Sequence, residues 1–249
     1  MGDIFTGMIR DNEKRKKFNI YESIFWVLIF LVTAFILLRS PIFEVRRILV
    51  SGNQFLSEEK IRSVAGVNIG LNIFKLNLSI TEGNLKIIPM IREVQVTRVL
   101  PSTVHITVTE RRPLGLLPTE EGFIEVDGEG VCLQKAGIGT PGLPVITGVI
   151  IEQAIPGEIL QAERLGEALT VISGLPEEAL SMLSEVHVDS DKQIKVYTME
   201  GIQCRLGPAI EIPEKGAVLT QVLQEVLKQG TKISYIDLSC SSMPVVRFK

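Results

Sequence analysis

The 249-residue sequence has little cysteine, little histidine and no marked excess of charge of either sign. Its three cysteines, Cys132, Cys204 and Cys240, are too few and too odd in number for a disulfide framework. None has the Cys-x-x-Cys spacing of a zinc site. We expect all three to be small apolar residues on strands. The formal net charge of −3 argues against nucleic acid as a partner of the chain as a whole.

Motifs that would support catalysis or cofactor binding are also missing. His105 and His187 each lie in an alternating strand pattern, with no second His at metal-ligating spacing. There is no Gly-x-Ser-x-Gly, and no serine has a histidine partner by motif. Residues 137–142 have the spacing of a dinucleotide fingerprint, but the prolines around them, such as Pro144, exclude the helix that must follow. We therefore expect no catalytic constellation, cofactor, metal or small-molecule substrate.

What the sequence does contain is one long apolar run. The uncharged segment Ser23–Leu38, extended by Ile20 and Tyr21, is about 19 residues long and covers roughly 28 Å as a helix, which is close to the thickness of the hydrocarbon core. A cleaved signal peptide would have a shorter run and a small-x-small site after it, and none follows here. We predict an uncleaved transmembrane helix over residues 20–39.

Basic residues on the two sides of this run predict its orientation. Five precede it, Arg10 and the four within 14–17, and three follow it, Arg39, Arg46 and Arg47. The denser cluster is expected on the inner side of the membrane. Residues 1–19 are therefore predicted to be a short cytoplasmic tail with little fixed structure, and the rest of the chain to lie outside the cell membrane.

The segment 43–112 has a pattern of strand, two helices and two strands. A strand begins at Val45 and ends at the Ser51–Asn53 turn signal. Helices are expected over 57–65, with Ser57 as N-cap and Gly66 as the stop, and over about 77–87. Two alternating strands follow, joined by a hairpin loop at 100–102. We expect a sheet with two helices on one face and water on the other.

The segment 113–249 reads as a second, strand-rich domain. We expect a hairpin around Asp127 and Gly128, a short strand at Val145, and a series of strands between 184 and 206. Helices are expected over Ala162–Ser173 and Lys215–Lys228. The predicted fold class is therefore α+β: one membrane helix, a small first domain and a mixed, β-rich second domain.

The chain closes on a further strand pattern that begins at Ile233. Ile236, Leu238 and Cys240 would share an apolar face, and Tyr235, Asp237 and Ser239 the other. The backbone edge of such a strand could accept a strand from a partner protein. It could equally be an internal strand, and the residues alone leave both possibilities open.

Two stretches resemble a known family. Val50-Ser51-Gly52-Asn53 and the run Ile91–Pro113, which reads I-x-x-V-x-V-x-R-x-x-P-S-T-V-x-I-x-V-x-E-R-x-P, resemble the POTRA domain, the polypeptide-transport-associated module. A POTRA domain directly after a single anchor, followed by a β-rich domain, is the architecture of the FtsQ/DivIB cell division family. The resemblance covers nearly the whole chain.

The resemblance implies a function as well as a fold. It implies a non-enzymatic scaffold at the division septum, in contact with other divisome members, that binds FtsB/DivIC-like and FtsL-like partners by strand addition and couples them to septal peptidoglycan synthesis. The closing stretch matches the family's partner-binding segment at Tyr235, Asp237, Val245 and Val246, with Arg247 beside them; Ser239 replaces an Arg that many relatives carry, which puts a charged contact in doubt. Arg46 and Arg47 resemble part of a recruitment surface, although they could equally touch anionic lipid headgroups.

Two other classes of protein remain as alternatives. A POTRA-bearing transport component would assist the assembly of outer-membrane proteins, but it normally continues into a barrel of alternating strands rather than the helices expected here. An anchored hydrolase would need a catalytic set that the sequence does not present.

Overall fold

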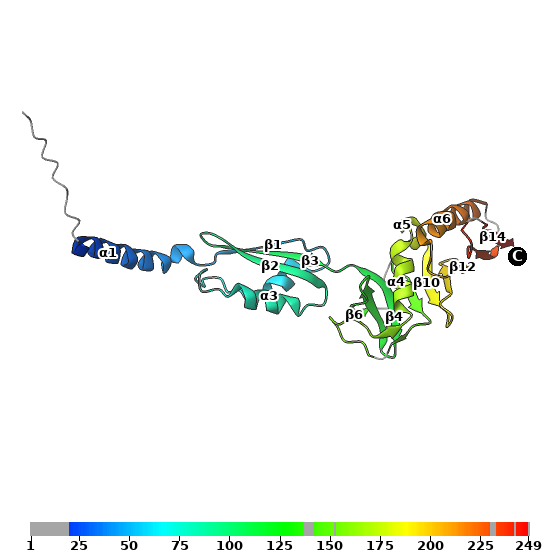
Figure 1. The fold of residues 1–249 in the computed structure, drawn as a ribbon, viewed down its shortest axis with the longest axis horizontal. Helices are drawn as coiled ribbons and strands as arrows, with labels where there is room; N and C mark the ends of the chain where they lie inside the picture. Colours follow the sequence, from blue (N-terminus) through cyan, green and yellow to red (C-terminus); the bar gives the residue numbers. More distant parts are fainter. Residues whose placement is uncertain (1–19, 137–141, 152, 230–232, 242, 249) are drawn as a thin grey trace, which may run out of the picture.

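The computed structural model describes residues 20–136, 142–151, 153–229, 233–241 and 243–248 (Figure 1). The tail 1–19, which contains the five basic residues that precede the helix, lies outside them, as does most of the glycine-rich stretch 137–142. Helix α1 (Ile20–Leu38) ends one residue before the end of the predicted span 20–39, and this helix of 19 residues is long and apolar enough to cross a membrane. It lies at one end of an elongated molecule, and the last strand lies at the other (Figure 1).

The first domain has the predicted order of elements. The short helix η1 (Pro41–Phe43) leads into the elements β1 (Arg47–Ser51), α2 (Glu58–Ala65), α3 (Leu78–Lys86), β2 (Ile91–Val99) and β3 (Thr103–Glu110). Strand β3 is central, pairing in parallel with β1 and antiparallel with β2. The predicted cap is present, because Ser57 Oγ accepts a hydrogen bond of 3.2 Å from the amide of Lys60. Gly66 ends α2 in the left-handed conformation with φ of 66°.

Alternation along the strands builds the core of this domain. Val104, Ile106 and Val108 of β3 are buried, while His105 and Thr107 between them face the open side of the sheet. The buried side chains lie against the core-facing residues of α2 and α3, which include Ile61, Ala65 and Leu85.

The second domain is built around a mixed sheet of nine strands in the order β14-β13-β12-β11-β10-β7-β4-β5-β6. Its strands are β4 (Pro113–Thr119), β5 (Gly122–Asp127), β6 (Cys132–Ala136), β7 (Val145–Thr147), β10 (Leu183–Val188), β11 (Ile194–Thr198), β12 (Gln203–Gly207), β13 (Ile233–Asp237) and β14 (Val245–Phe248). A separate pair comprises β8 (Ile150–Ile151) and β9 (Ala162–Glu163). The helices are α4 (Leu165–Gly174), α5 (Glu177–Leu180) and α6 (Ile212–Gln229).

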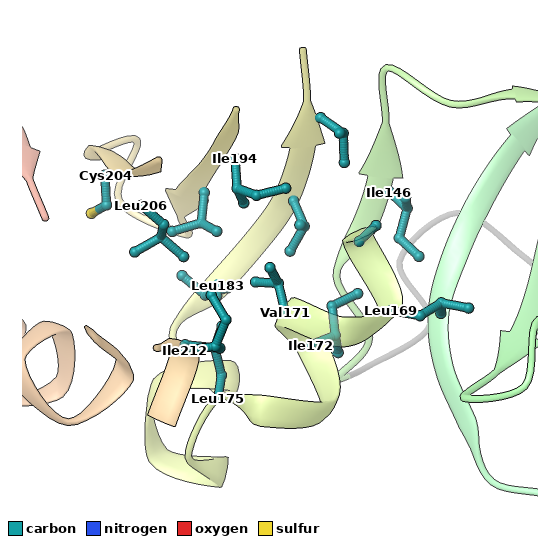
Figure 2. Close-up of a cluster of buried hydrophobic side chains, with 14 of the residues drawn as sticks. Ile146, Leu169, Val171, Ile172, Leu175, Leu183, Ile194, Cys204, Leu206 and Ile212 are labelled. Atoms are coloured by element: carbon teal, nitrogen blue, oxygen red, sulfur yellow. The ribbon is translucent and has the colours of Figure 1, made fainter. Parts of the chain in front are cut away.

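The hydrophobic core of this domain lies between the helices and the sheet. Val171, Ile172 and Leu175 point from the region of α4 toward Leu183 and Ile194 on the strands (Figure 2). The apolar residues of the central strands are almost fully buried, which gives the domain a core of its own, separate from that of the first domain.

The second domain differs from the prediction in several elements, and the helix expected over Lys215–Lys228 begins earlier, at Ile212. The helix expected over Ala162–Ser173 begins only at Leu165, because Arg164 has a left-handed φ of 66° and separates it from β9. The sequence pattern predicts no strand over Pro113–Thr119, yet β4 lies inside the sheet, between β7 and β5. Proline and glycine are uncommon in strands, so the prolines and the glycine of β4 obscure the strand pattern in the sequence.

The expectation for the cysteines is confirmed for two of the three. Cys132 on β6 and Cys204 on β12 are buried strand residues. Cys240 is exposed and lies outside the strands, because β13 ends at Asp237 and the chain turns after Leu238. Its predicted place on an apolar face with Ile236 and Leu238 is therefore wrong.

Candidate partner-binding edge

The closing stretch forms two strands, not one. Strand β13 pairs in parallel with β12 through Gln203–Tyr235 and Cys204–Ile236, and antiparallel with β14 on its other side. Both edges of β13 are therefore occupied within the chain. The free edge predicted for this strand lies instead on β14, the outermost strand of the sheet.

Strand β14 presents an accessible edge with apolar side chains. Val245 and Phe248 are 55% and 59% exposed, and Arg247 is also exposed. Val246 is partly buried and packs against the hydrophobic core, which fixes the strand to the domain. Among the described residues, no strand pairs with the outer side of β14, so its backbone groups on that side are available to another chain.

An aromatic and cationic row crosses the sheet beside this edge. The ring of Tyr235 lies between two guanidinium groups, with Arg205 Cζ at 4.8 Å and Arg247 Cζ at 5.9 Å from its centroid. The three residues come from β12, β13 and β14 in turn. Cation–π contacts of this kind hold the arginines over the ring and leave positive charge at the margin of the sheet.

The turn between β13 and β14 is shaped by its polar side chains. Asp237 Oδ1 accepts a hydrogen bond of 3.0 Å from the amide of Ser239, and Ser241 Oγ donates one of 3.0 Å to Glu211 Oε2. The backbone of Gly207 approaches Ser239 so closely that a Cβ there would lie 3.3 Å from the Ser239 Cα. Asp237 and Ser239 therefore direct the chain into β14.

The structure gathers the predicted partner-binding residues into one corner of the second domain. Val245, Val246 and Arg247 lie on the edge strand itself. Sequence reasoning missed Arg205, which stands beside Tyr235 only because the parallel pairing of β12 with β13 brings together residues separated by the whole of α6. The alternation of apolar and polar residues in β12 predicts that Arg205 is exposed between two buried neighbours. No local pattern predicts that it lies next to β13, which is distant in sequence.

The two arginines of the predicted recruitment surface lie at the other end of the molecule, close to α1. The amides of Arg46 and Arg47 donate to the carbonyl of Ser102, at 2.8 and 3.3 Å, and both side chains are exposed. They are therefore well separated from the edge formed by β14 (Figure 1).

One polar cluster outside this corner has residue types that can support chemistry. On the sheet face opposite the helices, Thr147 Oγ1 lies 2.7 Å from His187 Nδ1, and His187 Nε2 lies 3.0 Å from Asp189 Oδ1. The Thr147 hydroxyl also donates to Glu185 Oε1 at 2.5 Å, so its proton is held by a carboxylate rather than by the imidazole. The arrangement joins strands β7 and β10, which is a structural role.

Among the described residues, no group of three or more His, Cys, Asp or Glu side chains is arranged so that it could hold a metal ion. Burial raises the pKa of the Cys204 thiol to about 12, so it remains protonated at neutral pH.

Comparison with known proteins gives one consistent result. Residues 43–111 match the model of the FtsQ-type POTRA domain, and residues 115–239 match that of the C-terminal domain of cell division protein FtsQ/DivIB. FtsQ of Geobacter sp. is 30% identical over 214 residues, covering 84% of this chain and 77% of that protein. FtsQ of Myxococcus fulvus is 29% identical over 214 residues, covering 83% and 73%. DivIB of Clostridium botulinum is 26% identical over 244 residues, covering 95% and 94%.

Proposed function

The chain belongs to the FtsQ/DivIB family of cell division proteins, and from that premise we propose that it is a non-enzymatic scaffold of the division machinery that acts by binding. Because the relatives are cell division proteins, we propose this role in place of the alternative role as a polypeptide-transport component. In this proposal α1 anchors the protein in the cell membrane with the N-terminus in the cytoplasm, as the basic residues before the helix favour. Both domains then lie outside, at the septum.

The binding step proposed is the addition of a partner strand to β14. The observation that supports it is the position of β14 at the end of the sheet, with Val245, Arg247 and Phe248 exposed and no described strand on its outer side. Ladder hydrogen bonds would supply affinity, and the side chains beside the edge would supply specificity. The partners proposed are FtsB/DivIC-like and FtsL-like proteins, through which the scaffold would influence septal peptidoglycan synthesis.

Proline substitution tests whether the backbone edge itself binds the partner. Successive amides of a strand point to opposite sides, so of Val246 and Arg247 one faces β13 and the other faces outward. Proline removes that donor. We expect one of the variants Val246→Pro and Arg247→Pro to keep the unfolding midpoint of the wild type but to lose capture of single-span coiled-coil proteins from solubilised membranes.

Capture is measured by affinity purification of the full-length chain from its own envelope, with equal amounts of folded protein. Gln134→Ala, on the opposite edge strand β6, is the control and should capture partners as the wild type does. Strand addition at β14 is wrong if both proline variants remain folded and both still capture partners.

A further inference from the structure

Several large apolar side chains are exposed at the end of the first domain that adjoins α1. Ile69 is 72% exposed, Leu100 57% and Phe74 43%, and they come from two different loops. Ile42 of η1 and Val99 at the end of β2 are also about half exposed, at 54% and 47%. Large apolar side chains that gather at one site on a surface usually mark a contact with another apolar phase.

Hydrogen bonds hold the loop 68–75 beside the end of α1. Asn72 Nδ2 donates to the carbonyl of Leu38, the last residue of the helix, at 2.8 Å. The amide of Ile73 donates to the carbonyl of Phe43 at 2.7 Å, and the rings of Phe43 and Phe74 lie 5.1 Å apart. The position of Phe74 is therefore fixed relative to the point where the anchor would leave the bilayer.

The hairpin loop 100–102 reaches the same end of the domain. Its Ser102 carbonyl accepts from the amide of Arg46 at 2.8 Å, and the turn between β2 and β3 points toward α1 (Figure 1). Leu100 is therefore brought from a distant part of the sequence to the same level as Phe74.

The charge at this end is strongly positive. Arg39, Arg46, Arg47 and Lys75 are all exposed, and within 39–47, 68–77 and 98–103 the only acidic residue is Glu44, which is half-buried. Exposed apolar groups surrounded by lysine and arginine are characteristic of surfaces that lie in the interface of an anionic membrane. The long basic side chains can reach phosphate groups while the apolar ones stay in the acyl boundary.

We propose that this end of the first domain rests in the headgroup region of the bilayer that α1 crosses. Ile69, Phe74 and Leu100 enter the interface, and Arg46, Arg47 and Lys75 bind the phosphates of anionic lipids. The domain is then held against the membrane by three separate segments rather than by the anchor alone. This rests on the proposed anchoring by α1 but is independent of partner binding at β14.

Quenching by brominated lipids tests this contact directly. Trp26 of α1 is the only tryptophan of the chain. In a Trp26→Phe background, Phe74→Trp places a single reporter in the loop, and Ile69→Trp is a second position in case the first disturbs the ring contact with Phe43. Phe55→Trp and Ile87→Trp are matched controls, because these residues are 60% and 76% exposed at the opposite end of the same domain.

Each full-length variant is reconstituted alone in nanodiscs of anionic lipid brominated near the glycerol backbone. We expect the tryptophan emission of the Phe74→Trp and Ile69→Trp variants to fall by about twofold or more relative to unbrominated lipid, with no change for the control positions. The charge-reversed pair Arg46→Glu and Lys75→Glu should weaken this quenching, and Arg112→Glu at the far end should not.

Two results would overturn the proposal. Equal quenching at the near and far positions would mean that the domain does not rest on the membrane. A blue-shifted but unquenched emission from the Phe74→Trp variant would mean that protein rather than lipid covers the loop. Quenching of the native Trp26 in the wild-type chain reports separately whether α1 is seated in the bilayer, so failure of the anchor and failure of the loop contact are distinguishable.

Discussion

At the scale of single residues, charged side chains join neighbouring strands on the open face of the large sheet. Asp189, at the end of β10, accepts a hydrogen bond of 2.6 Å from Lys195 Nζ on β11 and lies 3.0 Å from His187 Nε2. The hydrogen bond from Lys195 lowers the pKa of the Asp189 carboxyl below its ordinary value, and the bond to His187 lowers it further. The folded protein therefore favours the ionised form of this residue.

This shift predicts a dependence of stability on pH. A carboxyl whose pKa is lower in the folded state stabilises the fold above its unfolded pKa, and the contribution is lost as the pH falls through the folded pKa. Asp189→Asn should therefore lower the free energy of unfolding at pH 7, and the difference from the wild type should shrink as the pH is lowered below about 4. Urea denaturation of both proteins at several pH values measures it.

Asp191→Asn is the control for this prediction, since Asp191 is an exposed residue of the same turn. It should change stability little at any pH. If the free energies of unfolding of the wild type and Asp189→Asn differed by the same amount across the whole pH range, the proposed link between the Asp189 pKa and stability would be wrong.

At the scale of elements, the sequence predicts best those whose signals are local. Ser57 and Gly66 delimit α2 because capping depends on a few adjacent residues. Strand β4 has no such signal: Gly115 is there because a Cβ would lie 2.7 Å from Ile146 Cδ1 of β7, a contact that exists only in the folded sheet. The separation of β13 from β14 was missed for a similar reason, since the turn is held by Glu211, far away in sequence.

Two helical glycines illustrate the difference between local propensity and packing. Around Gly83 of α3, no atom lies within 4 Å of where a Cβ would be. At Gly216 of α6, a Cβ would lie 2.5 Å from Pro176 Cδ and 2.9 Å from Leu175 Cδ2, where α6 meets the start of α5. Gly83 therefore affects stability only through the conformational entropy of the chain. Gly216, by contrast, allows α6 to approach α5 closely.

Alanine substitution at these positions should therefore have opposite effects. We expect Gly83→Ala to stabilise the first domain by about 0.5–1 kcal/mol, because alanine favours the helix. Gly216→Ala should destabilise the second domain by about 1–3 kcal/mol through overpacking. Hydrogen exchange of the core amides of each domain measures the two changes independently, and a destabilising Gly83→Ala would refute the explanation given for α3.

At the scale of the whole molecule, the two domains are joined by ion pairs and a small apolar contact. Arg111, at the end of the first domain, binds Asp127 Oδ2 at 2.6 Å and Glu129 Oε2 at 2.8 Å, and Arg92 also pairs with Glu129. Met90 of the first domain is buried with Val131 and Leu133 of the second, in a cluster separate from the two main cores. The contact fixes the direction in which the second domain continues from the first.

Removal of Arg111 should weaken this joint. The Arg111 and Asp127 side chains are only 17% and 6% exposed, and loss of one partner leaves a buried carboxylate without its cation. We expect Arg111→Ala to destabilise the chain by about 2–4 kcal/mol and to increase hydrogen exchange on both sides of the joint. Lys135→Ala removes the exposed pair with Glu121 and should leave stability nearly unchanged, because water screens this pair.

The anchor and the proposed partner edge lie at opposite ends of one elongated molecule, and the central claim is that the outer side of β14 binds a strand of another protein. Site-specific photocrosslinking in dividing cells tests this most directly, with benzoylphenylalanine at Arg247 on β14 and, as control, at Gln134 on the opposite edge strand β6. We expect covalent adducts with single-span coiled-coil proteins from position 247 and none from position 134. Adducts of equal yield from both positions, or none from position 247 in cells that divide normally, would contradict the claim.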